Sequence, residues 1–242
     1  MVTSATREHL SAGQALFARY AFPPNELGYC GPTDTPRSEL ASHAREFDGA
    51  WPYLRAIAHA GGVTDALDAD VVASYWVGGK LLGRVEPAEL LETLRGYFRG
   101  QRTGLLDDVP AGIGVLAHHS FHVFVVYPWI GFLERDATTP MQVLQDCRIR
   151  WGTVDSVDGE HAAVLSRPLR YDGEYLTLGE PTAERVRWSK DGVSLMAAPA
   201  PGDVISAHWD WICDTLSDDE AAALAAATQA TLDLVNRIKN RS

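Results

Sequence analysis

The first half of the chain carries apolar residues at helical spacing. Leu10, Leu16, Phe17 and Tyr20 predict a helix over residues 8–20. Further helices are expected over residues 37–47, 51–60, from Asp68 or Asp70 toward Leu82, and 88–99, the last with Pro87 in its first turn. Two clusters of proline and glycine within residues 22–32 predict a loop after the first helix.

Residues 111–133 are more apolar, and their periodicity does not separate a helix from a buried strand. Their length exceeds that of an ordinary strand and their surroundings are helical, so we expect a helix. Thr139 and Pro140 then open a short helix over residues 141–145.

After Cys147 the pattern changes to short segments rich in Val, Ile, Trp and Tyr. Three Asp–Gly pairs, at residues 158–159, 172–173 and 191–192, are typical of hairpin turns. The segments predict strands over residues 147–157, 161–170, 175–178, 185–188, 193–197 and 204–211. Strands this short and numerous favour a small β-barrel.

The chain closes with a predicted helix, which begins at the capping box Ser217-Asp218-Asp219-Glu220. The predicted fold class is therefore α+β: an all-helical N-terminal domain, followed by a small β-barrel with a C-terminal helix. The change in pattern places the domain boundary near residue 140, which gives domains over residues 1–140 and 141–242.

Composition excludes several classes of protein. The 242 residues have a net charge of −11, with 46% hydrophobic and 22% charged residues. This composition is globular, and a strongly acidic chain disfavours nucleic acid as a partner. No apolar run reaches the roughly 18 residues of a membrane span, and residues 1–8 contain no hydrophobic signal core. Three widely spaced cysteines do not form a disulfide framework, so we expect a cytoplasmic protein with reduced thiols.

Two groups of candidate metal ligands lie in the helical half. His118, His119 and His122 form the densest imidazole cluster, and on a helix His118 and His122 share one face. The alternative is that these are hydrogen-bonded histidines of an apolar segment. Cys30 follows Tyr29 in the Pro/Gly loop, where it is either displayed for function or buried as a small apolar residue.

Cys147 is the more informative cysteine of the second half. Arg148 and Arg150 follow it and are expected to lower its pKa, which favours the thiolate that binds metals. Burial as a core residue is the alternative. Cys213 follows Trp211 and Ile212 at the end of a strand, and we interpret it as a core residue.

The order of motifs from Cys147 onward resembles the hydrogenase-maturation chaperone family HypC (HupF). The matching elements are Cys147-x4-Gly152-x-Val154, the turn Asp158-Gly159, the strand His161-Ala162-Ala163-Val164, Pro201-Gly202-Asp203-Val204-Ile205-Ser206-Ala207-His208, the aromatic Trp211, and the helix start Leu216-Ser217-Asp218-Asp219-Glu220-Ala221. The resemblance implies an OB-like barrel with a C-terminal helix. In the family the cysteine is N-terminal after methionine removal, whereas Cys147 is internal.

The resemblance also implies a chemistry. HypC proteins carry the iron–dicyanide–carbonyl unit of nickel–iron hydrogenase to the precursor of the large subunit, and a cysteine and a strand histidine handle the iron. By position these residues are Cys147 and His208. Thiolate and imidazole both suit low-spin iron. The whole chain, with Asn25-Glu26-Leu27-Gly28-Tyr29-Cys30-Gly31-Pro32 and Tyr127-Pro128-Trp129, also resembles an uncharacterised actinobacterial family found beside hydrogenase genes.

The leading hypothesis is an accessory protein of nickel–iron hydrogenase assembly. Its cargo or cofactor is iron with carbonyl and cyanide ligands, and its partners are the large-subunit precursor or other maturation proteins. Trp209 and Trp211 are candidates for a docking surface, with barrel core as the alternative. A second hypothesis is an enzyme with a metal held by the three clustered histidines beside Tyr29 or Cys30. The third is a metal-free interaction module.

Overall fold

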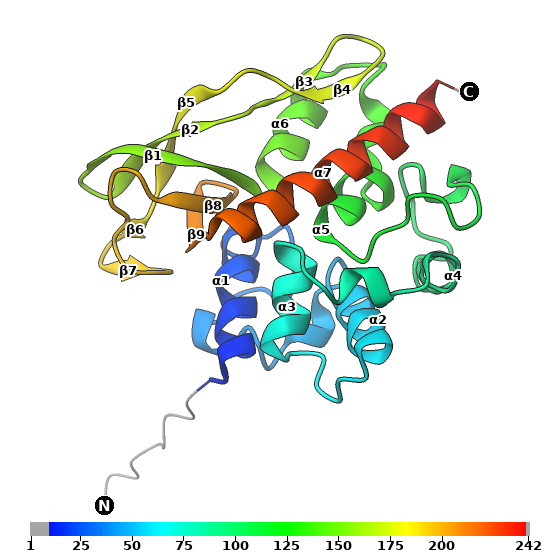
Figure 1. Cartoon of the computed structure of the whole chain (residues 1–242), viewed down its shortest axis with the longest axis horizontal. Coiled ribbons are helices and arrows are strands. Elements are labelled where there is room, and N and C mark those ends of the chain that lie inside the picture. Colours follow the sequence, from blue (N-terminus) through cyan, green and yellow to red (C-terminus); the bar gives the residue numbers. More distant parts are fainter. Residues whose placement is uncertain (1–9, 241–242) are drawn as a thin grey trace, which may run out of the picture.

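A computed structural model describes residues 10–240 of the chain. Residues 1–8, in which the sequence predicts no signal segment, and the first two residues of the predicted helix 8–20 lie outside this range. The α-helices are α1 (Ala12–Glu26), α2 (Trp51–Gly61), α3 (Ala69–Trp76), α4 (Pro87–Tyr97), α5 (His119–Phe121), α6 (Thr138–Cys147) and α7 (Asp218–Lys239). Figure 1 shows α1 to α4 gathered below the strands, with α7 running diagonally across the molecule.

Short helical turns join these elements. They are the 3₁₀ turns η1 (Arg37–Glu39), η2 (Ala44–Glu46), η3 (Leu82–Arg84), η4 (Leu106–Asp108) and η6 (Pro128–Phe132), and the π-helix η5 (His122–Val126). The prediction of one continuous helix over 111–133 is thus wrong, because this range contains three short helical elements instead. Gly112 and Gly114 adopt positive φ, and only α5, η5 and η6 are helical. Pro128 lacks an N–H and begins a new turn rather than continuing η5.

Five strands form the main sheet of this mixed helix-and-sheet fold. The strands of the chain are β1 (Arg150–Asp158), β2 (His161–Ser166), β3 (Leu169–Tyr171), β4 (Leu176–Leu178), β5 (Thr182–Arg187), β6 (Ser189–Lys190), β7 (Val193–Ser194), β8 (Val204–His208) and β9 (Trp211–Thr215). The sheet order is β1-β2-β5-β9-β8, and β8 pairs again with β1, so the sheet closes on itself. The pairs β3-β4 and β6-β7 form separate small ribbons.

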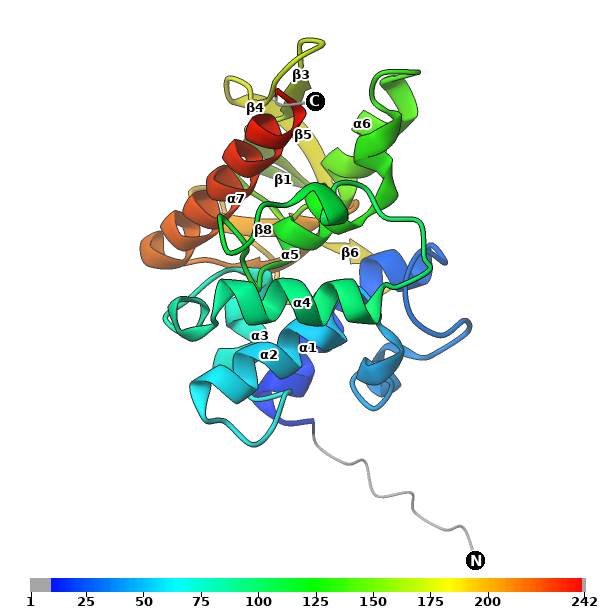
Figure 2. The ribbon, with the colours of Figure 1, turned by 90° about the vertical axis from the view of Figure 1, so that its right-hand side faces the viewer.

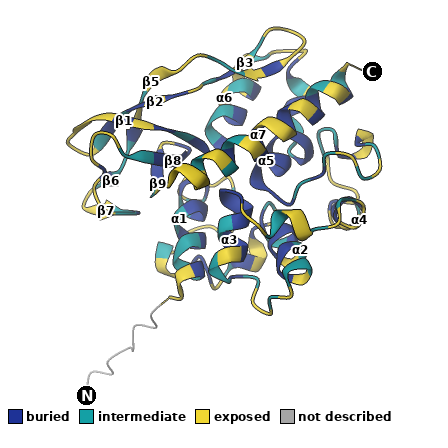
Figure 3. Ribbon diagram, viewed as in Figure 1, coloured by how far each residue is buried: buried dark blue, intermediate teal, exposed yellow. Residues whose placement is uncertain are grey.

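One apolar core connects the helices with the sheet. Its buried side chains run from Phe17 in α1 to Ile238 in α7 and include Trp211 of β9. A smaller cluster fills the inside of the closed sheet, with Val154 and Val186 among its members. Figure 3 shows the buried faces turned toward the contacts between the elements. The core therefore contains residues from both sides of residue 140. The domain boundary at that position remains a prediction.

Helix α7 ties the halves of the molecule together. Its N-terminus has the predicted capping box, in which Ser217 and Glu220 satisfy each other's backbone N–H groups. Its apolar face packs against α5, η5 and β4. Helix α6 packs against β3 and α7 against β4, so both helices contact the small β3–β4 ribbon. Figure 2 shows α7 and α6 on the left and right of the view.

Helix α1 is longer than the sequence indicated. It continues through Pro23 and Pro24 to Glu26, although the proline and glycine clusters had predicted a loop from residue 22. Proline is tolerated here because the two residues fall in the last turn, where only the carbonyls of Arg19 and Tyr20 lose their helical donors. The loop thus begins only after Glu26, with Gly28 at φ 74°.

Three predicted strands in the second half also differ from the structure. The strand predicted over 161–170 is two strands, β2 and β3, which belong to different sheets. Cys147 is the last residue of α6 rather than the first of a strand, and β1 begins at Arg150. The strand predicted over 204–211 is a hairpin, β8 and β9, that turns at Trp209 and Asp210. Trp209 has φ 52°, the left-handed conformation that such a turn requires. None of the helices within residues 10–240 has the length and apolar character needed to cross a membrane.

Candidate metal centre

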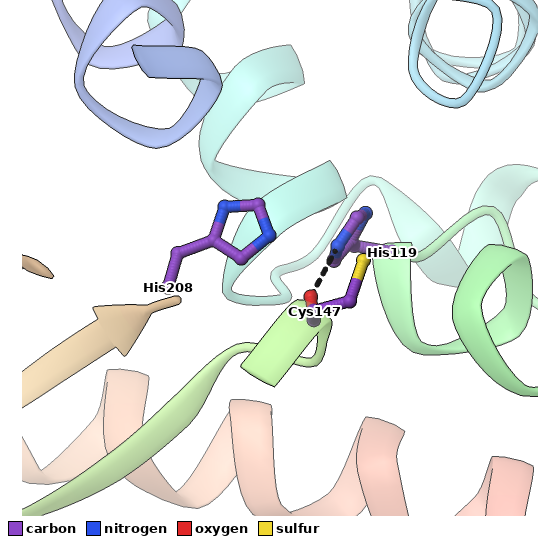
Figure 4. Close-up of side chains that lie close together, drawn as sticks. All are labelled: His119, Cys147 and His208. Carbon is purple, nitrogen blue, oxygen red and sulfur yellow. Dashed lines mark hydrogen bonds between the residues drawn. The ribbon is translucent and has the colours of Figure 1, made fainter. Parts of the chain in front are cut away.

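Three ligand-type side chains converge where the helices meet the sheet. They are His119 of α5, Cys147 at the end of α6 and His208 at the end of β8. One ligand atom of each lies within 4.8 Å of the others, and all three residues are buried. Figure 4 shows the His208 ring turned toward His119 and the Cys147 sulfur. A thiol and two imidazoles are the ligand types that iron, zinc and copper prefer among protein groups.

His208 is prepared to act as a ligand. Its Nδ1 lies 2.7 Å from the carbonyl oxygen of Tyr20, which accepts the ring proton. The remaining nitrogen, Nε2, therefore carries a lone pair. Nε2 is buried without a hydrogen-bond partner. A histidine whose second nitrogen is held by a backbone carbonyl is the usual arrangement of a metal-binding imidazole.

His119 is oriented by two contacts. Its Nε2 donates to the carbonyl oxygen of Cys147 at 2.9 Å, and its Nδ1 lies 2.9 Å from the Tyr75 hydroxyl. That hydroxyl also lies against the carbonyl oxygen of Gly49, so its single proton serves one acceptor at a time. His119 must exchange one of these hydrogen bonds to bind a metal, whereas His208 needs no such exchange.

Arg150 fixes Cys147 relative to His208. Its guanidinium donates to the carbonyls of Gln145 and Asp146 at the end of α6 and to that of Trp209 in the β8–β9 turn. It also pairs with Glu184 at 3.1 Å. In addition, the backbone N–H of Trp209 donates to Asp146 at 2.7 Å. The cysteine and the histidine thus come from elements joined by a buried cation.

Burial keeps the ligands neutral. Desolvation raises the pKa of the Cys147 thiol well above its usual value, so the prediction that Arg148 and Arg150 lower this pKa is wrong. Arg150 is engaged by Glu184 and by backbone carbonyls instead. Burial also lowers the pKa of His119 to about 4 and that of His208 well below its usual value. Neutral imidazoles bind metals, and a metal would displace the thiol proton.

A small cavity lies among the three ligands. Its volume is about 30 Å³, and its polar lining groups are Cys30, Tyr75, His119, His122, Cys147 and His208. A space of this size admits a water or an ion but no organic substrate. The residues therefore fit a metal site better than a cysteine nucleophile, which needs an accessible thiolate.

The structure brings together some of the predicted ligands and separates others. Cys147 and His208 meet as the family resemblance implies, and Cys30 and His122 line the same cavity. His118 lies apart because it precedes α5 and caps it. Its Nδ1 accepts from the backbone N–H of Ser120, whose hydroxyl bonds Thr231 of α7. The helical face predicted for His118 and His122 is therefore not formed.

The two tryptophans after His208 are buried within the chain. Trp211 is fully buried and donates from Nε1 to Glu26 at 2.9 Å. Trp209 is 7% exposed and stacks on Tyr29, with ring centroids 4.3 Å apart. Neither side chain offers the docking surface that the sequence suggested, because both pack against α1 and the loop after it. Cys213 is buried, as expected for a core residue.

His119 does not stand out in the sequence as a ligand. Helical spacing favours His118 and His122 only if residues 118–122 form one continuous helix. The chain instead starts α5 at His119 and changes to a π-helix at His122. The available signal was that His119 belongs to the same imidazole cluster.

Comparison with known proteins gives one match. Residues 9–242 match a family that is described as a family of unknown function, DUF6390. No curated protein and no solved structure matches the chain. The chain therefore belongs to the DUF6390 family, and its candidate centre consists of His119, Cys147 and His208.

Proposed function

We propose that this protein binds a transition-metal ion through His119, Cys147 and His208 and acts as a metal carrier or assembly factor. The observation that carries the proposal is the buried Nε2 of His208, which has no protein partner and faces a thiol and a second imidazole. An unpartnered polar atom in a core is costly, and a metal ion would satisfy it. Three protein ligands leave coordination positions for other groups.

The cargo that we propose is iron with small ligands, in the maturation of nickel–iron hydrogenase. The support is the HypC-like order of motifs, in which Cys147 and His208 take the positions of the iron-handling cysteine and histidine. The partners on this proposal are the hydrogenase large-subunit precursor or other maturation proteins. The OB-like character of the closed sheet belongs to the same proposal, as does a cytoplasmic location.

Metal binding is tested first, with the full chain and Co²⁺ as the probe. We expect one Co²⁺ per chain and a thiolate-to-cobalt absorption band that is absent in Cys147→Ala. His119→Ala and His208→Ala should weaken binding, whereas His59→Ala, at an exposed position of α2, should not. Absence of binding by the unsubstituted chain would refute the proposal and favour the metal-free module.

The iron cargo is tested separately. Protein purified from cells that express hydrogenase maturation enzymes should carry iron with infrared bands of bound carbonyl and cyanide, and Cys147→Ala should lack them. Co²⁺ binding without these bands would leave the metal site in place and contradict the hydrogenase assignment. Metal retention by Cys147→Ala and His208→Ala together with loss in His118→Ala and His122→Ala would instead favour the enzyme that uses the histidine cluster.

A further inference from the structure

A second, larger pocket opens beside the metal cavity. Its volume is about 340 Å³, and its walls include Glu46, Asp48 and Arg102. It shares four wall residues with the small cavity: Cys30, Gly49, His122 and Tyr127. The two pockets therefore adjoin each other at these four residues.

Cys30 is held in the shared wall by its whole loop. Asn25 donates from its amide nitrogen to the carbonyls of Cys30 at 2.9 Å and Pro32 at 2.8 Å. On one side Tyr29 stacks on Trp209. On the other, Gly31 adopts φ 77° and the Phe47 ring occupies the space of a Cβ, which would meet that ring at 2.3 Å. The loop thus holds Cys30 in place as a residue that lines both pockets.

His122 and Gly49 form the neighbouring part of the wall. A Cβ on Gly49 would lie 2.9 Å from Nε2 of His122. Because Gly49 has no side chain, it leaves that edge of the His122 ring uncovered. The only hydrogen bond to the His122 ring among the described residues is a long contact of 3.4 Å from Nδ1 to the Tyr53 hydroxyl. The ring packs against the rings of Tyr53, Phe98, His119 and Tyr127, but its nitrogens are only weakly hydrogen-bonded.

The outer pocket has a charge balance that suits a cation. Its walls carry two carboxylates and one guanidinium. Glu46 pairs with His43 at 2.6 Å, Asp48 accepts from the Tyr97 hydroxyl at 2.7 Å, and the Arg102 guanidinium stacks on Phe132 at 4.7 Å. The acidic excess raises the local concentration of metal ions at the mouth of the cavity.

We infer that Cys30 is a transfer thiol that passes the metal between the outer pocket and the buried centre. The inference rests on the proposed metal site. On loading, the metal bonds to the Cys30 sulfur, and the displaced thiol proton leaves to solvent water in the outer pocket. The metal–sulfur bond to Cys30 then breaks as the bond to Cys147 forms, and the proton lost by Cys147 returns to Cys30. No electron is transferred, and release follows the same steps in reverse.

The test separates a transfer thiol from a resident ligand. Co²⁺ is mixed with the full chain and the thiolate-to-cobalt band is followed in time; removal by a chelator gives the release rate. In Cys30→Ala we expect an unchanged final spectrum and affinity, with loading and release slower by about tenfold or more, because the thiolate is the ligand exchanged. Cys213→Ala, which removes a buried thiol outside both pockets, is the matched control and should behave like the unsubstituted chain.

A second variant tests the passage without touching a thiol. Gly49→Ala places a methyl group against His122 and should slow loading while the final spectrum stays the same. Loss of band intensity and affinity in Cys30→Ala would make Cys30 a resident ligand and overturn the inference. Loading at the unsubstituted rate in both variants would overturn it as well. If the unsubstituted chain binds no Co²⁺, it is the proposed function that fails.

Discussion

His208 donates its Nδ1 proton to the carbonyl oxygen of Tyr20 across 2.7 Å. That carbonyl lacks its helical donor because the residue four positions later, Pro24, has no N–H. The proline in the last turn of α1 therefore supplies the acceptor that fixes the histidine tautomer. The lone pair of Nε2 then faces His119 and Cys147.

This relationship predicts the effect of Pro24→Ala. The new backbone N–H competes for the Tyr20 carbonyl and weakens its bond to His208. Co²⁺ affinity should fall, by up to about 10- to 100-fold, the usual contribution of a partner that orients a metal ligand. Pro23→Ala is the matched control, because it restores a donor to Arg19 instead. Equal affinity in the two variants would contradict the account.

The clamp formed by Arg150 gives a second prediction. Arg150→Met leaves Glu184 without its cation and frees the end of α6 from the β8–β9 turn. Removal of one partner of a buried pair costs about 3–5 kcal/mol, and we expect a loss toward the lower end because Glu184 is partly exposed. Chemical denaturation measures the loss, and Co²⁺ affinity should fall with it.

The control for the clamp is an exposed ion pair. Glu134→Gln removes the partner of Lys239 at a position where the carboxylate is 79% exposed. Its free energy of unfolding should change by less than about 1 kcal/mol. A similar small change in Arg150→Met would show that Arg150 does not hold the two elements together.

Some of this arrangement was accessible from the sequence and some was not. The capping box of α7 and the Asp–Gly turns at 158–159, 172–173 and 191–192 are local signals, and the structure confirms them. The sequence did not predict that α1 continues through Pro23 and Pro24. A helix tolerates prolines in its last turn, and the sequence pattern did not show that α1 ends only at Glu26. The His119 contact with Cys147 joins residues 28 positions apart, and no periodicity encodes it. The order of motifs from Cys147 onward led us to expect Cys147 and His208 as ligands, and it gave no reason to expect His119.

The buried histidines predict a pH dependence of stability. Desolvation lowers the pKa of His118 and His122 to about 3 and of His119 to about 4. The unfolded chain binds protons near pH 6.5, so stability is fully present above that pH and falls as the pH drops toward these folded values. Each histidine contributes a slope of at most about 1.4 kcal/mol per pH unit.

The measurement is urea unfolding of the chelator-treated protein between pH 7.5 and 5. His118→Asn, which removes one such group and keeps an acceptor for the Ser120 N–H, should have a shallower slope by about one proton. The same slope in both proteins would mean that His118 takes up its proton in the folded state.

X-ray absorption of the zinc-loaded full chain tests the central claim most directly. The account predicts one sulfur at about 2.3 Å and two imidazole nitrogens at about 2.0–2.1 Å, with the sulfur lost when Cys147→Ser is combined with Cys30→Ala, which removes the neighbouring thiol. Zinc surrounded by light atoms alone, or a sulfur that persists in this double variant, would contradict a centre built from His119, Cys147 and His208.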